Sequence, residues 1–370
     1  MSDDRLDEAI GPIAFGLVVP TLNECPNVEP LLERIEAALK SVVWEVIFVD
    51  DGSTDGTPEL VERLALVDRR VRLIQRVNRT GLSSAVTDGM MATAAPIVGV
   101  IDGDLQHDAA ILPALIEHVA NNQADIAIGS RYCQGGGTQD WPLPRRIGSK
   151  VANALGNLII GTPSTDPMSG YFVVRRKCVV DALPRLSGIG FKILIDLMAS
   201  SVPRLRVAEV PYVFQGRVAG ESKMGSAVIL DYMLLLVDKT IGRILPTRFV
   251  LFMMVGALGV LVHLTILALL MELGVGFTLA QAGAVSGAIL FNFTLNNLLT
   301  YRDRRLKGVR YFYGLASFAA VCSVGAFASV GVGTFVFSLD KIWWAAGLAG
   351  IATSALWNYS VTSFVTWRKK

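Results

Sequence analysis

Four long stretches without a charged side chain lie in the last third of this chain and limit what it can fold into. Each has at least 23 residues, and about 20 apolar residues in a helix are enough to cross a bilayer. Inside lipid the backbone must satisfy its own hydrogen bonds, so such segments form helices. We therefore predict an all-α transmembrane domain over residues 247–370. Its four spans are 249–271, 277–299, 311–339 and 342–367.

The charged residues divide the chain into two parts of different kinds. Residues 249–370 hold only 12 of the 66 Asp, Glu, Lys and Arg side chains, and residues 1–248 hold the rest with a net charge of −4. A typical soluble domain is about one quarter charged. The pattern excludes a purely soluble protein, a disordered protein and a disulfide scaffold. The overall charge of +2 gives no indication of nucleic-acid binding.

The basic residues around the spans predict the orientation in the membrane. The loop after the second span, YRDRRLKGVR, has five basic residues, the chain ends in WRKK, and Lys239, Arg243 and Arg248 precede the first span. Basic loops stay on the cytoplasmic side. The first residues, MSDDRLDEAI, lack the apolar core of a secretory signal peptide. We therefore expect a multi-pass protein of the cell membrane, with the front domain and both termini in the cytoplasm.

Residues 222–246 join the two parts. The segment SKMGSAVILDYMLLLVDKTIGR mixes apolar residues with charged ones, which favours amphipathic helices lying at the cytoplasmic face of the bilayer. A linker helix packed on the front domain is an alternative. Glycines in the spans would permit helix contacts within or between subunits, so a homo-oligomer is possible. Four asparagines in the spans are expected to hydrogen-bond across helices: Asn292, Asn296, Asn297 and Asn358.

The front domain, predicted over residues 1–221, alternates strands with helices. Expected strands are 16–20, 44–51, 71–77, 96–104 and 124–132, and expected helices are 27–40, 57–67, 81–94 and 111–120. This alternation, with continuous apolar strands, predicts a Rossmann-like α/β fold with a parallel sheet covered on both faces. Ligands bind such sheets at the carboxyl ends of the strands.

Acidic and amide side chains follow three of these strands. The first leads into PTLNE, the second ends in DDGSTDGT and the fourth in DGDLQH. One such turn alone is typical of a turn and helix cap. Three at one sheet edge would gather carboxylates that repel each other, and hard oxygen ligands of this kind suit Mg²⁺ or Mn²⁺, which also binds phosphates. The sequence has no GxxxxGK[ST] and no GxGxxG after the first strand, which argues against an ATPase and a dinucleotide-binding protein.

Seven motifs in order carry a resemblance to a known family. They are PTLNE, VDDGSTDGT, NRTGLSSAV, DGDLQHD, GSRY, DPMSGYFVVRR and VPYVFQGRVAGESKM. Over residues 14–225 the chain resembles the polyprenyl-phosphate hexose synthases, which are inverting GT-A glycosyltransferases related to dolichol-phosphate mannose synthase. The four spans resemble the GtrA-like membrane domain. The resemblance implies an α/β GT-A catalytic domain followed by a four-helix transmembrane domain.

The resemblance implies roles for individual residues of this chain. The expected donor-nucleotide contacts are Pro20, Leu22, Glu24, Asp51, Asp102 and Lys223. The expected ligands of Mg²⁺ or Mn²⁺ are Asp102, Asp104 and Gln106, with Gly103 where the family commonly has alanine. The expected acceptor-phosphate contacts are Arg131, Arg145 and Ser149, although Arg146 adjoins Arg145. The expected catalytic residues are Asp104, Arg131 and Arg217, and Arg217 and Lys223 belong to the loop over the diphosphate.

The implied reaction is the inverting transfer of a hexose from a nucleotide sugar to a polyprenyl (dolichyl) phosphate. GSRY, the Arg–Ser pair and RVAGESKM resemble the mannose synthases most, so GDP-mannose is the expected donor. UDP-glucose or another UDP-sugar is the alternative. A processive polysaccharide synthase is disfavoured because the chain has no QxxRW. A membrane half that translocates the sugar-lipid is a further alternative to a plain anchor.

Overall fold

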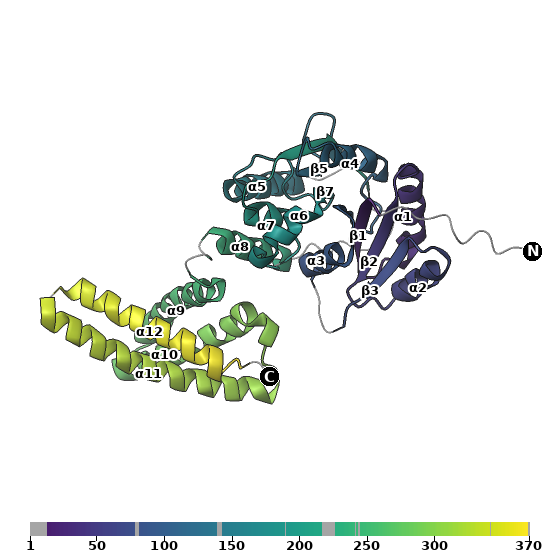
Figure 1. Cartoon of the computed structure of the whole chain (residues 1–370). Coiled ribbons are helices and arrows are strands. Elements are labelled where there is room, and N and C mark those ends of the chain that lie inside the picture. The colour runs from purple at the N-terminus through teal and green to yellow at the C-terminus, as the bar shows by residue number, and fades with distance from the viewer. Residues whose placement is uncertain are drawn as a thin grey trace, which may run out of the picture. The chain divides into compact units, whose positions relative to one another are not determined.

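The computed structural model contains two compact units, residues 1–240 and residues 241–370 (Figure 1). The structure describes residues 13–77, 81–138, 143–188, 190–216, 226–240, 242, 245–340 and 342–368. The division falls inside the predicted connecting segment, since the helix over Ser226–Thr240 belongs to the first unit.

A seven-stranded sheet forms the centre of the first unit. Its order is β3-β2-β1-β4-β7-β5-β8. The strands are β1 (Phe15–Thr21), β2 (Trp44–Asp50), β3 (Val71–Gln75), β4 (Ile97–Val100), β5 (Ile126–Ser130), β7 (Phe172–Arg175) and β8 (Val207–Pro211). All five predicted strands are present. The short pair β6 (Gly137–Thr138) and β9 (Val213–Phe214) forms a second, two-stranded sheet.

The five predicted strands run parallel to one another as expected, but the sheet also contains an antiparallel strand that the sequence analysis did not predict. β7 lies between β4 and β5 and runs antiparallel to both. β7 is antiparallel because of the sheet edge at which the chain enters it. Asp166, a few residues before β7, is hydrogen-bonded to Arg131 at the carboxyl end of β5, so the chain enters β7 from that edge and must run back through the sheet.

Helices cover both faces of the sheet, as the alternating pattern predicts. One face packs against α1 (Cys25–Ala38), α2 (Thr57–Val67) and α4 (Leu112–Ala120). The other packs against α3 (Leu82–Ala92), α6 (Arg176–Ala182) and α7 (Ile193–Ser200). Successive strand residues point to opposite faces. Leu17 and Val19 of β1 therefore enter the first core, and Val18 between them enters the second.

The helix α8 (Ser226–Thr240) packs on the first unit. The Tyr232 hydroxyl donates to the carbonyl of Ala152 in α5 (Leu143–Ile160) at 2.6 Å. Lys239 Nζ lies 2.6 Å from Asp196 Oδ1 of α7, and both side chains are buried. This is the packed linker helix that was the alternative to a free interfacial helix. Contact of α8 with the bilayer stays a prediction.

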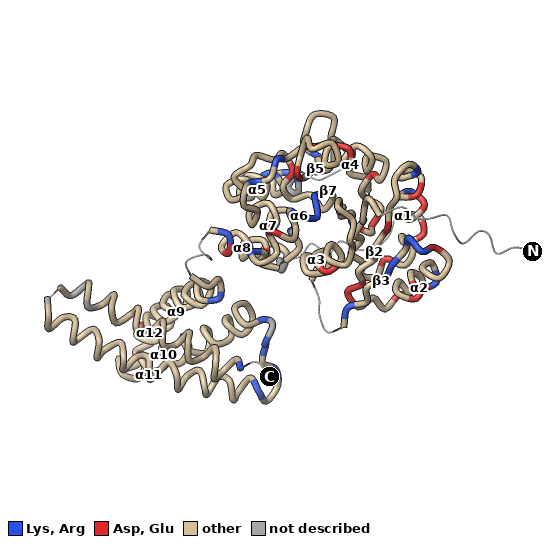
Figure 2. Tube along the Cα trace, viewed as in Figure 1, with Lys and Arg blue, Asp and Glu red and all other residues tan. Residues whose placement is uncertain are grey.

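The second unit is helical. Its long helices are α9 (Thr247–Glu272), α10 (Phe277–Leu295), α11 (Val309–Asp340) and α12 (Trp343–Val365). A π-helical turn over Asn296–Thr300 extends α10. Among the residues that the structure describes, three helices are long and apolar enough to cross a membrane: Thr247–Glu272, Phe277–Thr300 and Val309–Leu339. The fourth predicted span coincides with α12, a 23-residue helix, and its crossing stays a prediction. Figure 2 shows few charges in this unit, with basic segments near the α10–α11 loop and the C-terminus.

The second unit contains an internal repeat that the sequence analysis did not detect. Residues of the α9–α10 hairpin match residues of the α11–α12 hairpin 66 positions further on, as Gly259 matches Gly325 and Asn292 matches Asn358. A Cβ atom on Gly259 would lie 2.6 Å from Asn292 Cγ, and one on Gly325 would lie 3.0 Å from Asn358 Cγ. Each hairpin is therefore closed by the same glycine–asparagine contact.

The contacts between the two hairpins also occur in pairs whose members are related by the 66-residue offset. The rings of Phe252 and Tyr359 are 5.7 Å apart, and those of their counterparts Phe318 and Phe293 are also 5.7 Å apart. Reciprocal contacts of this kind define an approximate two-fold relationship. Its centre is marked by Tyr301 stacked on its own counterpart, Trp367, at 4.1 Å.

The asparagines of the spans differ from one another in their hydrogen bonds. Asn297 Oδ1 accepts from Nε1 of Trp367, two residues beyond the end of α12, at 3.1 Å, so it bonds to a segment outside its own helix. Asn296 instead donates to the Asn292 carbonyl of its own helix. The side-chain oxygens of Asn292 and Asn358 have no hydrogen-bond partner among the described residues. In the part of the chain that the structure describes, none of these three forms the predicted bond across helices. For Asn292 and Asn358, the glycine opposite offers packing space and no side-chain donor.

Candidate active site

The three strands with acidic ends are neighbours in the sheet, in the order β2-β1-β4. Thr21 is paired with Asp50 at the ends of β1 and β2. A Cβ atom on Gly103, just beyond β4, would lie 3.6 Å from both Glu24 Cγ and the Pro20 carbonyl oxygen. The predicted meeting of these turns at one sheet edge is therefore found.

The turns after β1 and β2 are bonded to each other. The backbone N–H of Asn23 donates to Ser53 Oγ at 2.8 Å, and that of Thr54 donates to Asn23 Oδ1 at 2.9 Å. Asp50 is buried and accepts from the N–H groups of Gly52 and Ser53. Asp50 is thus a turn-capping residue, whereas Leu22 and Glu24 beside it are partly exposed.

Asp51, a predicted nucleotide contact, is bound by a residue that the sequence analysis did not select. Arg76, whose side chain is 3% exposed, forms an ion pair with Asp51 Oδ1. The N–H of Gly81 donates to Asp51 Oδ2 at 2.7 Å. Arg76 also lies 3.3 Å from Asp88 of α3. Arg76 therefore fixes Asp51 at the sheet edge, and no sequence signal separates it from other arginines.

The predicted metal ligands follow β4 within six residues. The N–H of Gln106 donates to Asp104 Oδ1 at 3.2 Å, and Gln106 Nε2 donates to the Gln215 carbonyl at 3.0 Å. The Asp102 side chain is 36% exposed. A Cβ atom on Gly170 would lie 2.6 Å from Asp102 Oδ2, so glycine there leaves room for this carboxylate.

These residues fit a divalent cation by the chemistry of their donors. Two carboxylates and one amide are hard oxygen ligands of the kind that Mg²⁺ and Mn²⁺ take. Among the described residues, no three His, Cys, Asp or Glu side chains form a cluster that could hold a metal ion. A cation here would therefore depend on the Gln106 amide and on oxygens from a bound substrate.

The charge of Asp102 is favoured by its surroundings. Burial opposes ionisation, but the hydrogen bond from His107 and the positive charges of Lys192 and Arg131 outweigh it, and the pKa of Asp102 is lowered. Lys192 Nζ donates to the Met168 carbonyl at 3.1 Å. Burial and the charge of Arg131 lower the pKa of Lys192. At this sheet edge, the Asp102 carboxylate therefore lies near two positive charges, Arg131 after β5 and Lys192 before α7.

Arg131, at the end of β5, is paired with a buried carboxylate. Its Nε and Nη2 donate to the two oxygens of Asp166 at 2.7 Å each, and the Asp166 side chain is fully buried. Burial opposes the charge on Arg131, but Asp166 outweighs it and raises the pKa of the guanidinium above its usual range. The guanidinium also lies over the ring of Phe214, 5.4 Å from its centroid.

Two of the predicted acceptor-phosphate contacts are brought together. Tyr132 follows Arg131, and its hydroxyl donates to Ser149 Oγ of α5 at 2.8 Å. Arg145 is also on α5, but its side chain lies outside the described residues, as do Arg217 and Lys223. The roles of those three stay predictions.

Sequence reasoning missed four residues of this site besides Arg76. Asp166, Lys192, His107 and Tyr212 contact or surround the predicted residues. Asp166 and Tyr212 lie within motifs that carried the resemblance, and His107 directly follows Gln106, so these motifs were the available signal.

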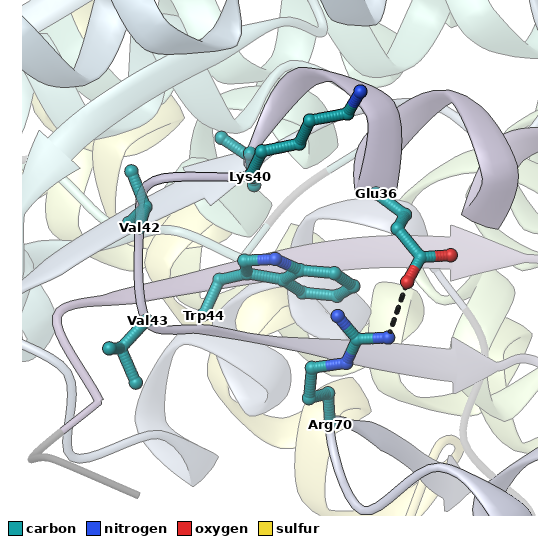
Figure 3. Close-up of a pocket in the computed structure, with 7 residues that line it drawn as sticks. Glu36, Lys40, Val42, Val43, Trp44 and Arg70 are labelled. Atoms are coloured by element: carbon teal, nitrogen blue, oxygen red, sulfur yellow. Dashed lines mark hydrogen bonds and ion pairs between the residues drawn. The ribbon is translucent and has the colours of Figure 1, made fainter.

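A shallow pocket of about 370 Å³ lies at the opposite edge of the sheet, at the start of β2. Figure 3 shows Arg70 beside Glu36 and over the ring of Trp44, whose centroid is 4.5 Å from the guanidinium carbon. Ligands of parallel sheets bind at the carboxyl ends of the strands. This pocket is therefore separate from the predicted site.

Comparison with known proteins agrees with both units. Residues 17–181 match glycosyl transferase family 2, and residues 251–367 match the GtrA/DPMS transmembrane domain. With its three apolar helices, the chain is a membrane protein. In solved structures, glucosyl-3-phosphoglycerate synthase from Mycobacterium tuberculosis is similar at 20% identity and a TM-score of 0.47, over 61% of this chain and 79% of that one. So distant a likeness carries no inference about donor or metal.

The curated relatives have a higher sequence identity to this chain than that solved structure has. A dolichol-phosphate mannosyltransferase of Pyrococcus furiosus is 36% identical over 95% of this chain and 98% of its own length. The Saccharomyces cerevisiae dolichol-phosphate mannosyltransferase is 36% identical over 60% of this chain and 85% of its own. The polyprenol monophosphomannose synthase of Mycolicibacterium smegmatis is 34% identical over 59% and 83%. The chain belongs to the dolichol-phosphate mannosyltransferase group of glycosyltransferase family 2 and has a GtrA/DPMS transmembrane domain.

Proposed function

We propose that this enzyme transfers mannose from GDP-mannose to a polyprenyl phosphate, with inversion at the anomeric carbon. The observation that carries the proposal is the arrangement of charge at one sheet edge. Asp102 and Asp104 follow β4, and Arg131 with its neighbour Tyr132 follows β5, on the other side of β7. The names of the curated relatives support mannosyl transfer.

The chemistry requires two anions to be held close together. A phosphate monoester has a second pKa of about 6, so the acceptor is already ionised at neutral pH and attacks without a strong general base. The chain must then offset the repulsion between the acceptor and the donor diphosphate. A guanidinium stays charged and binds phosphate through a fork of N–H groups. Arg131, oriented by Asp166, is suited to this task.

Asp102, Asp104 and Gln106 would hold Mg²⁺ or Mn²⁺ beside the donor. When bound, such an ion neutralises charge that builds up on the leaving nucleotide. Arg76 and the N–H of Gly81 hold Asp51, which together with Pro20, Leu22 and Glu24 would face the nucleoside. Arg217 and Lys223 would close the site over the diphosphate.

An enzyme with a lipid acceptor requires an apolar surface that can meet the bilayer. Ser149 lies on α5, and the same helix exposes Ile147, Val151 and Leu158. Spacings of four and seven residues place these three side chains on one helix face. Ser149, two residues from both Ile147 and Val151, lies on the opposite side of this helix. We propose that the apolar face lies against the bilayer while Ser149 and Arg131 contact the acceptor phosphate. The basic loop and both termini would then be cytoplasmic.

A transfer assay tests the proposal. The purified full-length protein in detergent would receive a short polyprenyl phosphate, Mn²⁺ and labelled GDP-mannose or UDP-glucose, and labelled lipid would be extracted. We expect product from GDP-mannose, its loss in Asp104→Asn and after chelation by EDTA, and its retention in Glu59→Ala, a change at an exposed carboxylate of α2. Product from UDP-glucose alone would overturn the donor. The absence of lipid product from both sugars would overturn the proposed reaction.

A further inference from the structure

A buried chain of hydrogen bonds leads from Asp102 into the protein. His107 Nε2 lies 3.1 Å from Asp102 Oδ2, and His107 Nδ1 lies 2.8 Å from the hydroxyl of Tyr212. The histidine side chain is 3% exposed. Three rings surround it, with centroids 5.2 Å away for Tyr171, 5.5 Å for Tyr212 and 5.4 Å for Phe214.

The partners of the imidazole decide where its hydrogen lies. A tyrosine hydroxyl can donate one hydrogen bond, and an ionised carboxylate can only accept. Burial raises the pKa of Tyr212, although the charge of Arg131 opposes this, so the hydroxyl keeps its hydrogen. His107 therefore donates from Nε2 to the ionised Asp102, and the Tyr212 hydroxyl, which can donate or accept, is hydrogen-bonded to Nδ1 on the other side of the ring.

The chain of bonds engages one oxygen of Asp102. Among the described residues, Asp102 Oδ1 has no hydrogen-bond partner, and the side chain keeps 36% of its surface exposed. Partners that orient a metal ligand in this way typically change metal affinity by about 10- to 100-fold when removed. An oriented carboxylate loses less rotational freedom when it binds an ion.

We infer that His107 and Tyr212 are positioning residues that orient the Asp102 carboxylate toward the divalent cation. The inference rests on the proposed function, because that function places the cation at Asp102. Tyr212 lies between β8 and β9, at the far side of the sheet from β1. The orientation of a ligand after β4 thus depends on a hydroxyl from a distant part of the chain.

The aromatic cluster contains its own control residue. Tyr171 packs against the same imidazole, but its hydroxyl donates to the Asp108 carbonyl at 3.0 Å. Tyr212→Phe and Tyr171→Phe each remove one buried hydroxyl and keep the ring. The first change removes the hydroxyl that is hydrogen-bonded to His107, and the second leaves that hydroxyl in place. A role in packing alone would make the two variants behave alike.

The test measures Mn²⁺ binding directly. Electron paramagnetic resonance would follow free Mn²⁺ titrated into the purified full-length protein with GDP, for the unchanged chain, Tyr212→Phe and Tyr171→Phe. We expect about tenfold weaker binding in Tyr212→Phe and unchanged binding in Tyr171→Phe. In transfer assays, Tyr212→Phe should raise the Mn²⁺ concentration for half-maximal rate while kcat recovers at saturation.

Three results would overturn the inference. Binding in Tyr212→Phe equal to that of the unchanged chain would show that the hydroxyl does not orient Asp102. Equal weakening in both variants would assign the effect to packing of the cluster. Failure of the unchanged chain to bind Mn²⁺ would remove the cation from the proposed function itself, and this result is separate from the other two.

Discussion

Asp166 receives two side-chain hydrogen bonds from Arg131 at 2.7 Å each and a third from the Arg131 backbone at 3.1 Å. The carboxylate is fully buried, and the guanidinium is one tenth exposed. The pair joins the end of β5 to the segment that enters β7. An arginine that is expected to bind a phosphate is thus fixed in direction before any substrate arrives.

Asp166→Asn should impair use of the acceptor more than use of the donor. The amide keeps the shape but removes the charge opposite Arg131, and breaking a buried pair costs about 3–5 kcal/mol of stability. We expect a raised KM for polyprenyl phosphate, measured by transfer at fixed GDP-mannose. Arg131→Lys keeps the charge but loses the two-pronged geometry, so it should also raise this KM. An unchanged acceptor KM in both variants would remove Arg131 from the acceptor site.

Gly170→Ala should weaken catalysis through Asp102. The new Cβ atom would lie 2.6 Å from Asp102 Oδ2, so the carboxylate must move. The matched change is Gly103→Ala, whose Cβ atom would meet its nearest neighbours at 3.6 Å, an ordinary contact. Because a displacement of about 1 Å can cost about 100-fold, we expect a loss of at least about tenfold in kcat/KM for Gly170→Ala and little change for Gly103→Ala. Equal rates would contradict the role given to this glycine.

Gly259→Ala should destabilise the second unit, because its Cβ atom would lie 2.6 Å from Asn292 Cγ. Overpacking of this kind costs about 1–3 kcal/mol. Gly256 lies one turn earlier on α9 and has open space around its Cβ position, so Gly256→Ala should be tolerated. Thermal unfolding in detergent would compare the two. Gly325→Ala should resemble Gly259→Ala, since the repeat places Asn358 against it, and opposite behaviour of the two would argue against equivalent hairpins.

Lys239→Met should loosen α8 from the first unit. In this variant the Asp196 carboxylate would stay buried without the Lys239 ammonium, which lies 2.6 Å away. Breaking a buried ion pair in this way costs about 3–5 kcal/mol of stability. Hydrogen exchange read by mass spectrometry should show lower protection of α8 peptides. Lys177→Met, at an exposed lysine of α6, serves as the control. Unchanged protection of α8 in Lys239→Met would mean that apolar contacts alone hold this helix.

The sequence by itself was sufficient for features that depend on local pattern. Apolar periodicity and turn residues predicted five of the seven strands of the main sheet, but not β7 or β8, and the three acidic turns that meet after β1, β2 and β4. Long uncharged segments predicted the helices of the second unit. These predictions succeed because strands and helices form according to the pattern of neighbouring residues. The same pattern shows at which end of a strand a turn lies.

Only the tertiary structure decided which distant residues meet. The antiparallel insertion of β7, the pairing of Arg131 with Asp166 and the bonds from Asp102 through His107 to Tyr212 join segments far apart in the chain. The stack of Tyr301 on Trp367 likewise revealed a repeat that uniformly apolar helices conceal. The physical reason is that a buried polar group needs a partner, and a pattern of residues shows this need but not which segment packs close enough to meet it.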